Sequence, residues 1–351
     1  MRRRASDGPT VRRSGGLAFG IALVWLTAGP PDRLTAQREP LNTGALFLVF
    51  PVGARAAGMG QAASALQGHG EAAFWNPAGL ATMEASEFAL HTATLVAGRS
   101  HAVTAYFASP PIGVIGGALY LVDYGDLEST DSIGNPIARV SPRNLEFLAS
   151  YATAVAGPFV LGLSYKLVEF RVDCSGDCRN FPNGRGVTHA LDVGGQFTLG
   201  VGGGNGVERG GLRVGVALRN VGFKLQVQNE AQADALPSRF VVGALYRLPL
   251  RPFRGGGPTG DDRFDLRVAA DVDSPWGDQG GSEMRVGLDV GFRELVRLRG
   301  GYAFVRDGLS GPSVGMGLTS GSIGVDLART FLTASDLVVP NPTFFSFHVA
   351  F

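Results

Sequence analysis

The histidines are the first residues to test for catalytic or metal chemistry, because an imidazole can act as an acid, a base or a metal ligand near neutral pH. The chain has five, and they are scattered, without a His-Glu-x-x-His pair or another catalytic spacing. They are His69, His91, His101, His189 and His348. The pattern predicts a protein that is not an enzyme and that holds no metal or other cofactor.

The two cysteines lie close together, in the stretch Cys174-Ser-Gly-Asp-Cys178. In an oxidising compartment, two thiols at this spacing favour a local disulfide that stiffens a loop. The alternative is a metal site, for which Asp173, Asp177 and His189 are the candidate further ligands. We predict the disulfide.

Charged residues near the C-terminus alternate with bulky apolar ones in three successive segments. On a strand, such alternation places the charges on one face and the apolar residues on the other. Facing lipid at mid-bilayer, each basic side chain would cost about 2 to 4 kcal/mol, so we expect the charges to face an enclosed lumen and to form ion pairs there. A soluble sandwich, which would leave them in water, is the alternative. The predicted lumen charges are Asp265, Arg267, Asp271, Glu283, Arg285, Asp289, Arg297 and Arg299.

The same alternation continues through most of the chain after Glu87 and predicts an all-β fold. We count about fourteen segments, each about as long as the 9 to 11 residues of a tilted membrane strand. Residues 87–351 are therefore predicted to form a transmembrane antiparallel β-barrel of about 14 strands. The segments begin near Glu87, His101, Ile112, Leu145, Phe159, Val187, Leu212, Arg239, Phe264, Glu283, Leu295, Ser313, Ile323 and Thr343.

The connections between these segments alternate in length, as in outer-membrane barrels with short periplasmic turns and long exterior loops. The expected short turns are 110–111, 156–158, 293–294 and 319–321. The expected long loops are 124–144, 173–186, 221–238, 273–282 and 330–342. Three connections depart from this rule, namely 98–100, 200–211 and 249–262.

The N-terminus has the layout of a secretory signal peptide over residues 1–36. Arginines precede an apolar run from Leu17 to Ala28, and small residues before Gln37 offer a cleavage point. The run is too short for a membrane-spanning helix, which needs roughly 20 apolar residues. Export to the outer membrane follows as the predicted location.

The overall composition agrees with an exported β protein and excludes a typical nucleic-acid binder. Lysine plus arginine number 31 and aspartate plus glutamate 30, for a net charge of +1, so the chain lacks the basic excess that binds polyanions. Its 52 glycines are about twice the usual usage of about 7%. We expect tightly packed backbones.

Residues 37–86 do not alternate, and their second half is rich in alanine and glycine. Asn76 before Pro77 predicts a helix start, with asparagine as the cap and proline in the first turn.

The last segment ends on an aromatic residue after an alternating run. Its outward set resembles the C-terminal signal by which the barrel-assembly machinery recognises outer-membrane barrels. The set is Phe345, Phe347, Val349 and Phe351.

Two stretches, GARAAGMGQAASAL and EAAFWNPAGLA, resemble the N-terminal hatch of the PorV/PorQ family of FadL-like outer-membrane barrels. The stretch 219–222, the segment LPSRFVVGALYRLP and the aromatic last strand are similar to the family too. Members of the wider fold have fourteen strands and an N-terminal plug. The resemblance therefore implies that residues 37–86 plug the barrel as a hatch, with the motif residues Gly53, Arg55, Gly58, Gly60, Asn76, Pro77 and Gly79. Members commonly carry an acidic pair in the hatch, whereas this chain has Gln67-Gly68-His69-Gly70, so the resemblance carries no ligand role to that stretch.

The resemblance implies a component of a protein-secretion pathway of the type IX kind, which receives secreted cargo or a second barrel at its exterior loops. The alternative is a FadL-like channel that takes up a hydrophobic small molecule. Apolar side chains lining a continuous lumen pocket would favour the channel, whereas a charged and plugged lumen favours the secretion role. Outer-membrane lipid is a partner in both hypotheses.

Overall fold

The computed structural model describes residues 43–109, 112–179, 183–203, 207–227, 233–250, 264–276, 281–293, 295–305, 308–333 and 340–351. The predicted signal peptide, the start of the predicted extension, the turn 110–111 and most of the connection 249–262 lie outside these residues.

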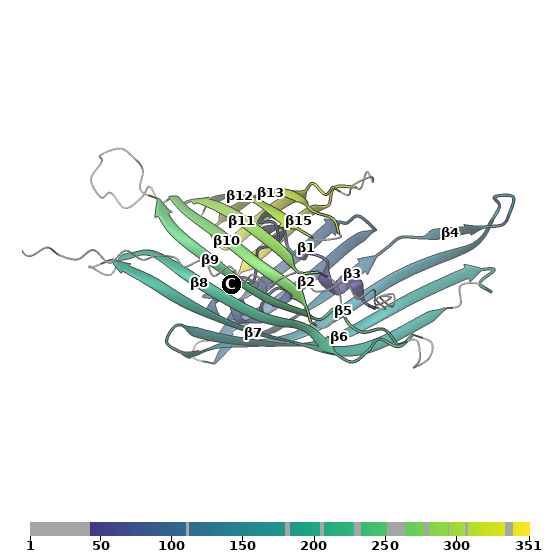
Figure 1. Cartoon of the computed structure of the whole chain (residues 1–351), viewed down its shortest axis with the longest axis horizontal. Coiled ribbons are helices and arrows are strands. Elements are labelled where there is room, and N and C mark those ends of the chain that lie inside the picture. Colours follow the sequence, from purple (N-terminus) through teal and green to yellow (C-terminus); the bar gives the residue numbers. More distant parts are fainter. Residues whose placement is uncertain are drawn as a thin grey trace, which may run out of the picture. The chain divides into compact units, whose positions relative to one another are not determined.

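Fourteen strands of the described chain close into an antiparallel barrel, which confirms the predicted fold (Figure 1). The first and last strands pair, with Glu87 opposite Ala350, and β3 pairs with β5, so the sheet has no open end. A further short strand, β4, pairs only with β5. The strands are β1 (Glu87–Thr94), β2 (Arg99–Ser109), β3 (Gly113–Asp123), β4 (Leu127–Thr130), β5 (Pro136–Ala156), β6 (Phe159–Gly176), β7 (Gly184–Gly203), β8 (Val207–Gly222), β9 (Arg239–Leu250), β10 (Phe264–Pro275), β11 (Glu283–Phe292), β12 (Val296–Phe304), β13 (Gly311–Ser320), β14 (Ile323–Thr330) and β15 (Thr343–Ala350).

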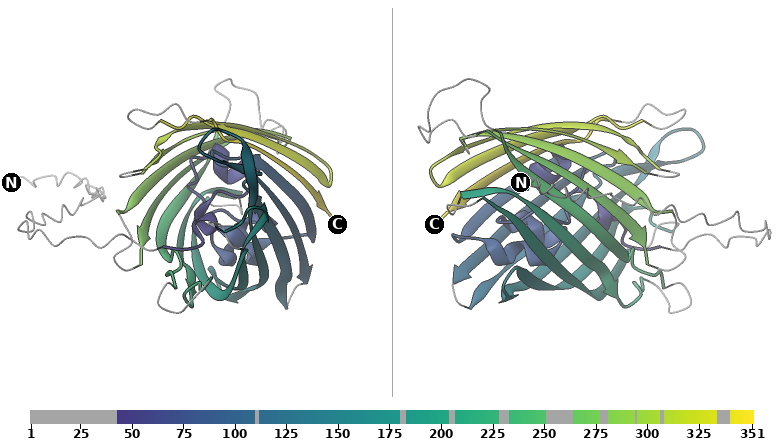
Figure 2. Two further views of the ribbon diagram at one scale, coloured as in Figure 1. Left: turned by 90° about the vertical axis from the view of Figure 1, so that its right-hand side faces the viewer. Right: turned by 60° about the vertical axis from the view of Figure 1, so that its left-hand side comes forward.

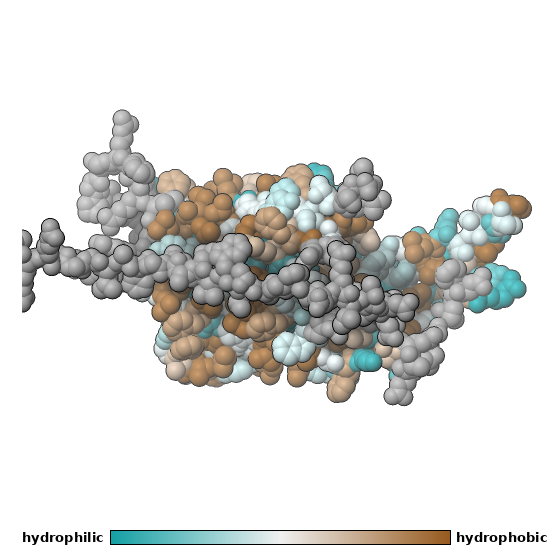
Figure 3. All heavy atoms as spheres, viewed as in Figure 1, coloured by the Kyte–Doolittle hydropathy of each residue, from teal (hydrophilic) through white to brown (hydrophobic). Residues whose placement is uncertain are grey.

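Side chains alternate between the two faces of the wall as the sequence predicts. In β10, Phe264, Val268 and Val272 are 40%, 43% and 49% exposed on the outside, whereas Asp265 and Asp271 are buried inside. Figure 3 shows the resulting apolar residues spread over the outer surface of the barrel. Alternation of this kind suits a wall with acyl chains on one side and a polar interior on the other.

Two predictions about connections are wrong. Residues 124–144 do not form a plain loop, because β4 and the first part of β5 make a hairpin there, with Leu127 opposite Val140. The stretch 200–211 is not a long connection either, because β7 and β8 pair through it, with Gly203 opposite Val207. Beyond the lipid a strand needs no apolar face, so backbone pairing continues there without the alternation that predicts it. The hairpin extends past the other strands at one end of the barrel (Figure 1).

Four short helices precede the wall and lie inside the barrel (Figure 2). They are η1 (Leu46–Val49), α1 (Ala54–Gly58), η2 (Gly70–Phe74) and η3 (Pro77–Thr82). The predicted cap is present, since the Asn76 side chain accepts a hydrogen bond from the amide of Ala78 at 3.1 Å, with Pro77 in the first turn of η3. Nearly all of these residues are buried. No helix in the described chain has the length and apolar character needed to cross a bilayer.

Candidate functional site

The hatch meets the wall of β11 to β13 backbone against backbone. A Cβ added to Gly60, whose φ is +62°, would overlap the amide of Tyr302, and one added to Gly301 would overlap Gly60 itself. Next to this contact, the Cα of Gly315 would lie 3.1 Å from a Cβ on Gly58. Only glycine permits such an approach, so glycines on both sides bring hatch and wall together.

A second glycine contact holds the other half of the hatch to β6 and β7. A Cβ on Gly162 would overlap the backbone of Pro77 and Ala78, and one on Gly194 would overlap the Asn76 side chain. The Asn76 amide also donates to the carbonyl of Ser64 at 2.7 Å. The Asn-Pro motif therefore caps η3 and forms part of the hatch–wall interface.

The two remaining glycines of the hatch motif lie against other parts of the hatch. Gly53 has φ +90°, and a Cβ there would overlap the carboxylate of Glu71. A Cβ on Gly79 would overlap the carbonyl of Leu66. These positions let the short helices pack against one another without side chains between them.

One predicted lumen charge, Asp271, binds the hatch rather than an arginine. Its Oδ2 accepts hydrogen bonds from the amides of Ala63 and Ser64, both at 2.8 Å, and its Oδ1 accepts from the Ser64 hydroxyl at 2.9 Å. A buried carboxylate that accepts several hydrogen bonds fixes the groups that donate to it. Asp271 therefore anchors the centre of the hatch to β10.

The other predicted lumen charges form ion pairs along the inner wall. Arg297 lies between Asp289, at 2.8 Å, and Asp265, at 3.0 Å. Arg299 lies between Asp289, at 3.3 Å, and Asp326. Arg285 contacts Asp273 and Glu283, and Arg267 contacts Asp265. Apart from Arg267, which is partly exposed, all of these charges are buried.

A second interior charge cluster was missed by the sequence prediction. The ammonium of Lys166, on β6, lies 3.0 Å from Glu146 and 2.8 Å from Asp192, and it donates to Asn220 at 2.7 Å. All four side chains are buried. The signal was available, because Ser164 and Lys166 alternate with Leu163, Tyr165 and Leu167 as the predicted charges do.

At the seam of the barrel, where β1 pairs with β15, the hatch and the wall share a third polar cluster. Arg55, in α1, forms an ion pair with Asp326 of β14 at 3.4 Å. Glu71, in η2, accepts a hydrogen bond from the amide of Ala56 at 3.0 Å. Burial raises the pKa of Glu71 to about 7, although the Arg55 guanidinium opposes the shift.

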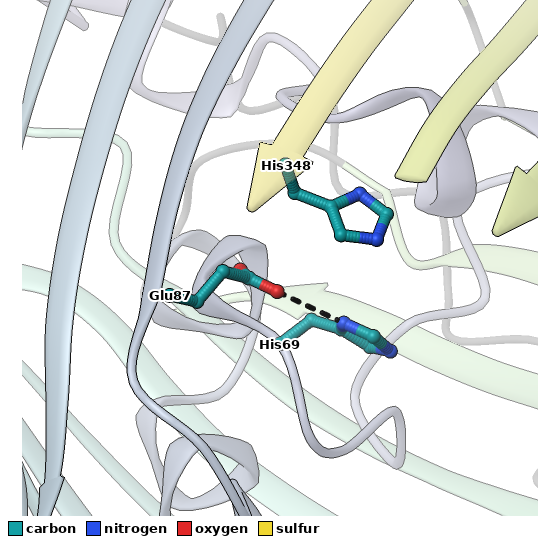
Figure 4. Close-up of side chains that lie close together, drawn as sticks. All are labelled: His69, Glu87 and His348. Carbon is teal, nitrogen blue, oxygen red and sulfur yellow. Dashed lines mark hydrogen bonds and ion pairs between the residues drawn. The ribbon is translucent and has the colours of Figure 1, made fainter. Parts of the chain in front are cut away.

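Three further residues of this cluster lie at the meeting point of β1, β15 and the hatch. His69 precedes η2, Glu87 begins β1 and His348 lies near the end of β15 (Figure 4). The Nδ1 of His69 is 3.2 Å from a carboxylate oxygen of Glu87, and the two imidazole centroids are 5.7 Å apart. Desolvation at this interface and the Arg55 guanidinium lower the pKa of His69 to about 4, so its imidazole is neutral at neutral pH.

Ser313 stands in the stretch 311–315, which fits the Gly-x-Ser-x-Gly spacing of hydrolase nucleophiles. That motif requires a strand-to-helix turn, but Ser313 lies within β13. Its hydroxyl accepts from the amide of Gly60 at 2.9 Å and donates to the carbonyl of Gly58 at 3.2 Å. Ser313 therefore holds the hatch rather than a reacting group.

The two cysteines form a disulfide, with the Cα atoms 5.9 Å apart. Cys174 lies near the end of β6, and its amide donates to the side-chain oxygen of Asn183 at 2.6 Å. The bond therefore closes a small loop after β6.

Two small cavities lie between the hatch and the wall. Each measures about 10 Å³, room for roughly one water molecule. One is lined in part by Pro51, His91 and Tyr120, and the other lies within the cluster around Arg55 and His69.

Residues 33–254 match the model of a family described as "Type IX secretion system protein PorV". The chain belongs to the PorV family. This result confirms the resemblance seen in the hatch stretches, and the barrel and its apolar outer face place the protein in the bacterial outer membrane. No curated protein matches the chain at the level of sequence.

Solved structures similar to this PorV-family chain share its fold at low identity. The monoaromatic hydrocarbon channel CymD is 14% identical with a TM-score of 0.53, and the alignment covers 86% of this chain and 97% of CymD. The toluene transporter TodX of Pseudomonas putida is 11% identical with a TM-score of 0.52, over 85% of this chain and 98% of TodX. These likenesses concern the fold of the barrel alone.

Proposed function

We propose that this PorV-family barrel is a non-enzymatic component of a type IX-like secretion pathway, and that it receives exported cargo or a partner barrel at its extracellular end. The observation that carries the proposal is the firmly held hatch inside the barrel. Backbone contacts, the hydrogen bonds of Asp271 and the buried Arg55–Asp326 ion pair hold it, and the two cavities described beside it are each the size of one water molecule. Drug-sized ligands occupy pockets of about 300 to 1,000 Å³.

The β4–β5 hairpin is the proposed receiving surface. Its tip carries Ile133, which is 82% exposed, and Leu127 nearby is 55% exposed. Hydrogen bonds within the turn hold its shape, since the Asp131 carboxylate accepts from the amides of Ile133 and Asn135 at 3.0 and 2.9 Å. An exposed apolar side chain on a rigid turn suits contact with another protein.

The other surfaces have simpler proposed partners. The apolar outer band of the wall contacts outer-membrane lipid. The outward residues of β15 and the residue after it, with Phe345 39% and Phe351 66% exposed, are the proposed recognition signal for the barrel-assembly machinery.

The alternative function, uptake of a hydrophobic small molecule, draws on the fold shared with the hydrocarbon channels CymD and TodX. Neither of the two cavities described above could hold such a molecule, and the hatch lies inside the barrel, so we expect uptake to require the hatch to leave its contacts. The two functions therefore differ in whether the hatch moves.

A pair of matched substitutions at opposite ends of the barrel tests the proposal. Ile133→Asp changes the hairpin tip, and Ile112→Asp changes the turn between β2 and β3, where Ile112 is 65% exposed. We expect I133D to lower the amount of secreted protein at least several-fold and I112D to leave it unchanged, at equal barrel levels in the membrane. Normal secretion in I133D and in the gene deletion, together with lost uptake of hydrophobic compounds in the deletion, would establish the channel instead.

A further inference from the structure

His69, Glu87 and His348 together have the donor set of a transition-metal site. Their potential ligand atoms, one from each residue, all lie within 4.8 Å of one another (Figure 4). Two imidazoles and one carboxylate suit zinc and other late first-row metals, which take nitrogen and oxygen ligands at about 2.0 to 2.2 Å. Ligand atoms around a tetrahedral zinc lie roughly 3.3 Å apart. Rotation of the imidazole rings can close the remaining distance.

The surrounding groups already orient two of the three side chains. The amide of Gly70 donates to Oε1 of Glu87 at 2.7 Å, which leaves Oε2 facing His69. The Nδ1 of His348 lies 3.7 Å from a carboxylate oxygen of Asp326. Metal sites commonly hold their ligands through such outer hydrogen bonds and carboxylate–imidazole pairs.

The cavity beside these residues is acidic and polar. Three carboxyl groups line it, those of Glu71, Glu87 and Asp326, against one guanidinium, that of Arg55. His91 lines it too, and its Nε2 is buried without a hydrogen-bond partner in the described chain. The volume, about 10 Å³, admits one ion or one water molecule but no organic ligand.

We propose that His69, Glu87 and His348 bind one divalent transition-metal ion, zinc being the best match. The ion ties the hatch, through His69, to the first and last strands of the barrel, which pair next to this point. It thereby joins the hatch and the start of β1 to the last strand, which is far away in the sequence, at the place where the barrel closes. This inference does not depend on the secretion role.

Calorimetric titration of the purified full-length barrel in detergent, prepared without a polyhistidine tag, tests the site with Zn²⁺ alone. We expect one ion per chain and at least a tenfold weaker affinity in His69→Gln and in His348→Gln. His101→Gln is the matched control, because His101 is exposed on the outside of β2, and its affinity should equal that of the wild type. The proposal would be overturned if the wild type showed no saturable Zn²⁺ binding, or if both ligand variants bound Zn²⁺ with unchanged affinity.

A second measurement separates a lost ligand from a damaged fold. His69 lies in the hatch, so H69Q leaves the strand pairing of the wall untouched, and heat-dependent migration on gels checks that the barrel is intact. We expect Zn²⁺ to raise the thermal unfolding temperature of the wild type and of H101Q and to leave that of H69Q unchanged. An equal rise in H69Q would contradict a site that includes the hatch.

Discussion

Two buried charge clusters in the lumen differ in what they join. Around Lys166, every partner comes from the wall, namely Glu146 on β5, Asp192 on β7 and Asn220 on β8. Around Arg55, one side comes from the hatch and the other from the wall strands β1, β14 and β15. Strand-to-strand charges stabilise the barrel itself, whereas charges shared with the hatch decide whether the plug stays in place.

The cluster around Lys166 should show the largest effect when it is broken. Lys166→Met leaves two buried carboxylates without their cation, and removal of one partner from a buried ion pair costs about 3 to 5 kcal/mol. We expect this loss in the free energy of unfolding of the whole barrel, measured by urea titration in detergent. Arg185→Met is the matched control, since the exposed Arg185 pairs with Glu169 and should give no resolvable change. Equal stability of K166M and R185M would remove the distinction between the clusters.

The glycine contact between hatch and wall involves no charge, and its loss should affect the hatch alone. Gly301 faces Gly60 of the hatch, whereas a Cβ on its neighbour Gly300 would meet no atom closer than 3.9 Å. Overpacking usually costs about 1 to 3 kcal/mol of stability. We expect Gly301→Ala to destabilise the docked hatch by about 3 kcal/mol, because backbone atoms block the added methyl group. Hydrogen exchange of the hatch amides should speed up in G301A and not in G300A. Unchanged exchange in G301A would mean that hatch and wall are not in this contact.

The smallest predicted effect is a pH dependence that belongs to Glu71. Its pKa of about 7 in the docked hatch exceeds the ordinary value of 4.5, so docking is favoured fully below pH 4.5 and loses this contribution as the pH rises toward 7. The loss amounts to about 2 kcal/mol between pH 5 and pH 7. Glu71→Gln keeps an acceptor for the Ala56 amide but does not titrate. We expect protection of that amide, corrected for intrinsic exchange, to fall with pH in the wild type only, and a parallel fall in E71Q would contradict the assignment.

Much of the wall was predictable from sequence, because lipid imposes a strict alternation on it. The strands that begin at Glu87, Phe159, Arg239, Phe264, Glu283, Ile323 and Thr343 start where the sequence predicts. The β4–β5 hairpin was not predictable by this signal, since its residues need no apolar face. The Lys166 cluster follows the same alternation as the predicted charges, and closer attention to single charges would have found it.

The cluster at the seam shows what the sequence leaves open. Barrel closure places the start of β1 beside the end of β15 and so brings Glu87 near His348. The position of His69 depends on how the hatch folds, and the hatch residues show no regular alternation of apolar and polar side chains. Backbone contacts between glycines place that segment, and glycines carry no side-chain pattern to read.

In the proposed secretion role, the hatch stays docked while the protein works. A double variant, Ala54→Cys with Ser346→Cys, tests this directly, because the Ala54 amide donates to the Ser346 hydroxyl at 2.9 Å and an oxidised pair would fasten α1 to β15. Secretion should be measured in cells with the pair oxidised and with it reduced, and cross-linking verified on gels. We predict equal secretion in both states. Secretion that stops on oxidation and returns on reduction would show that the hatch must move and would contradict the account.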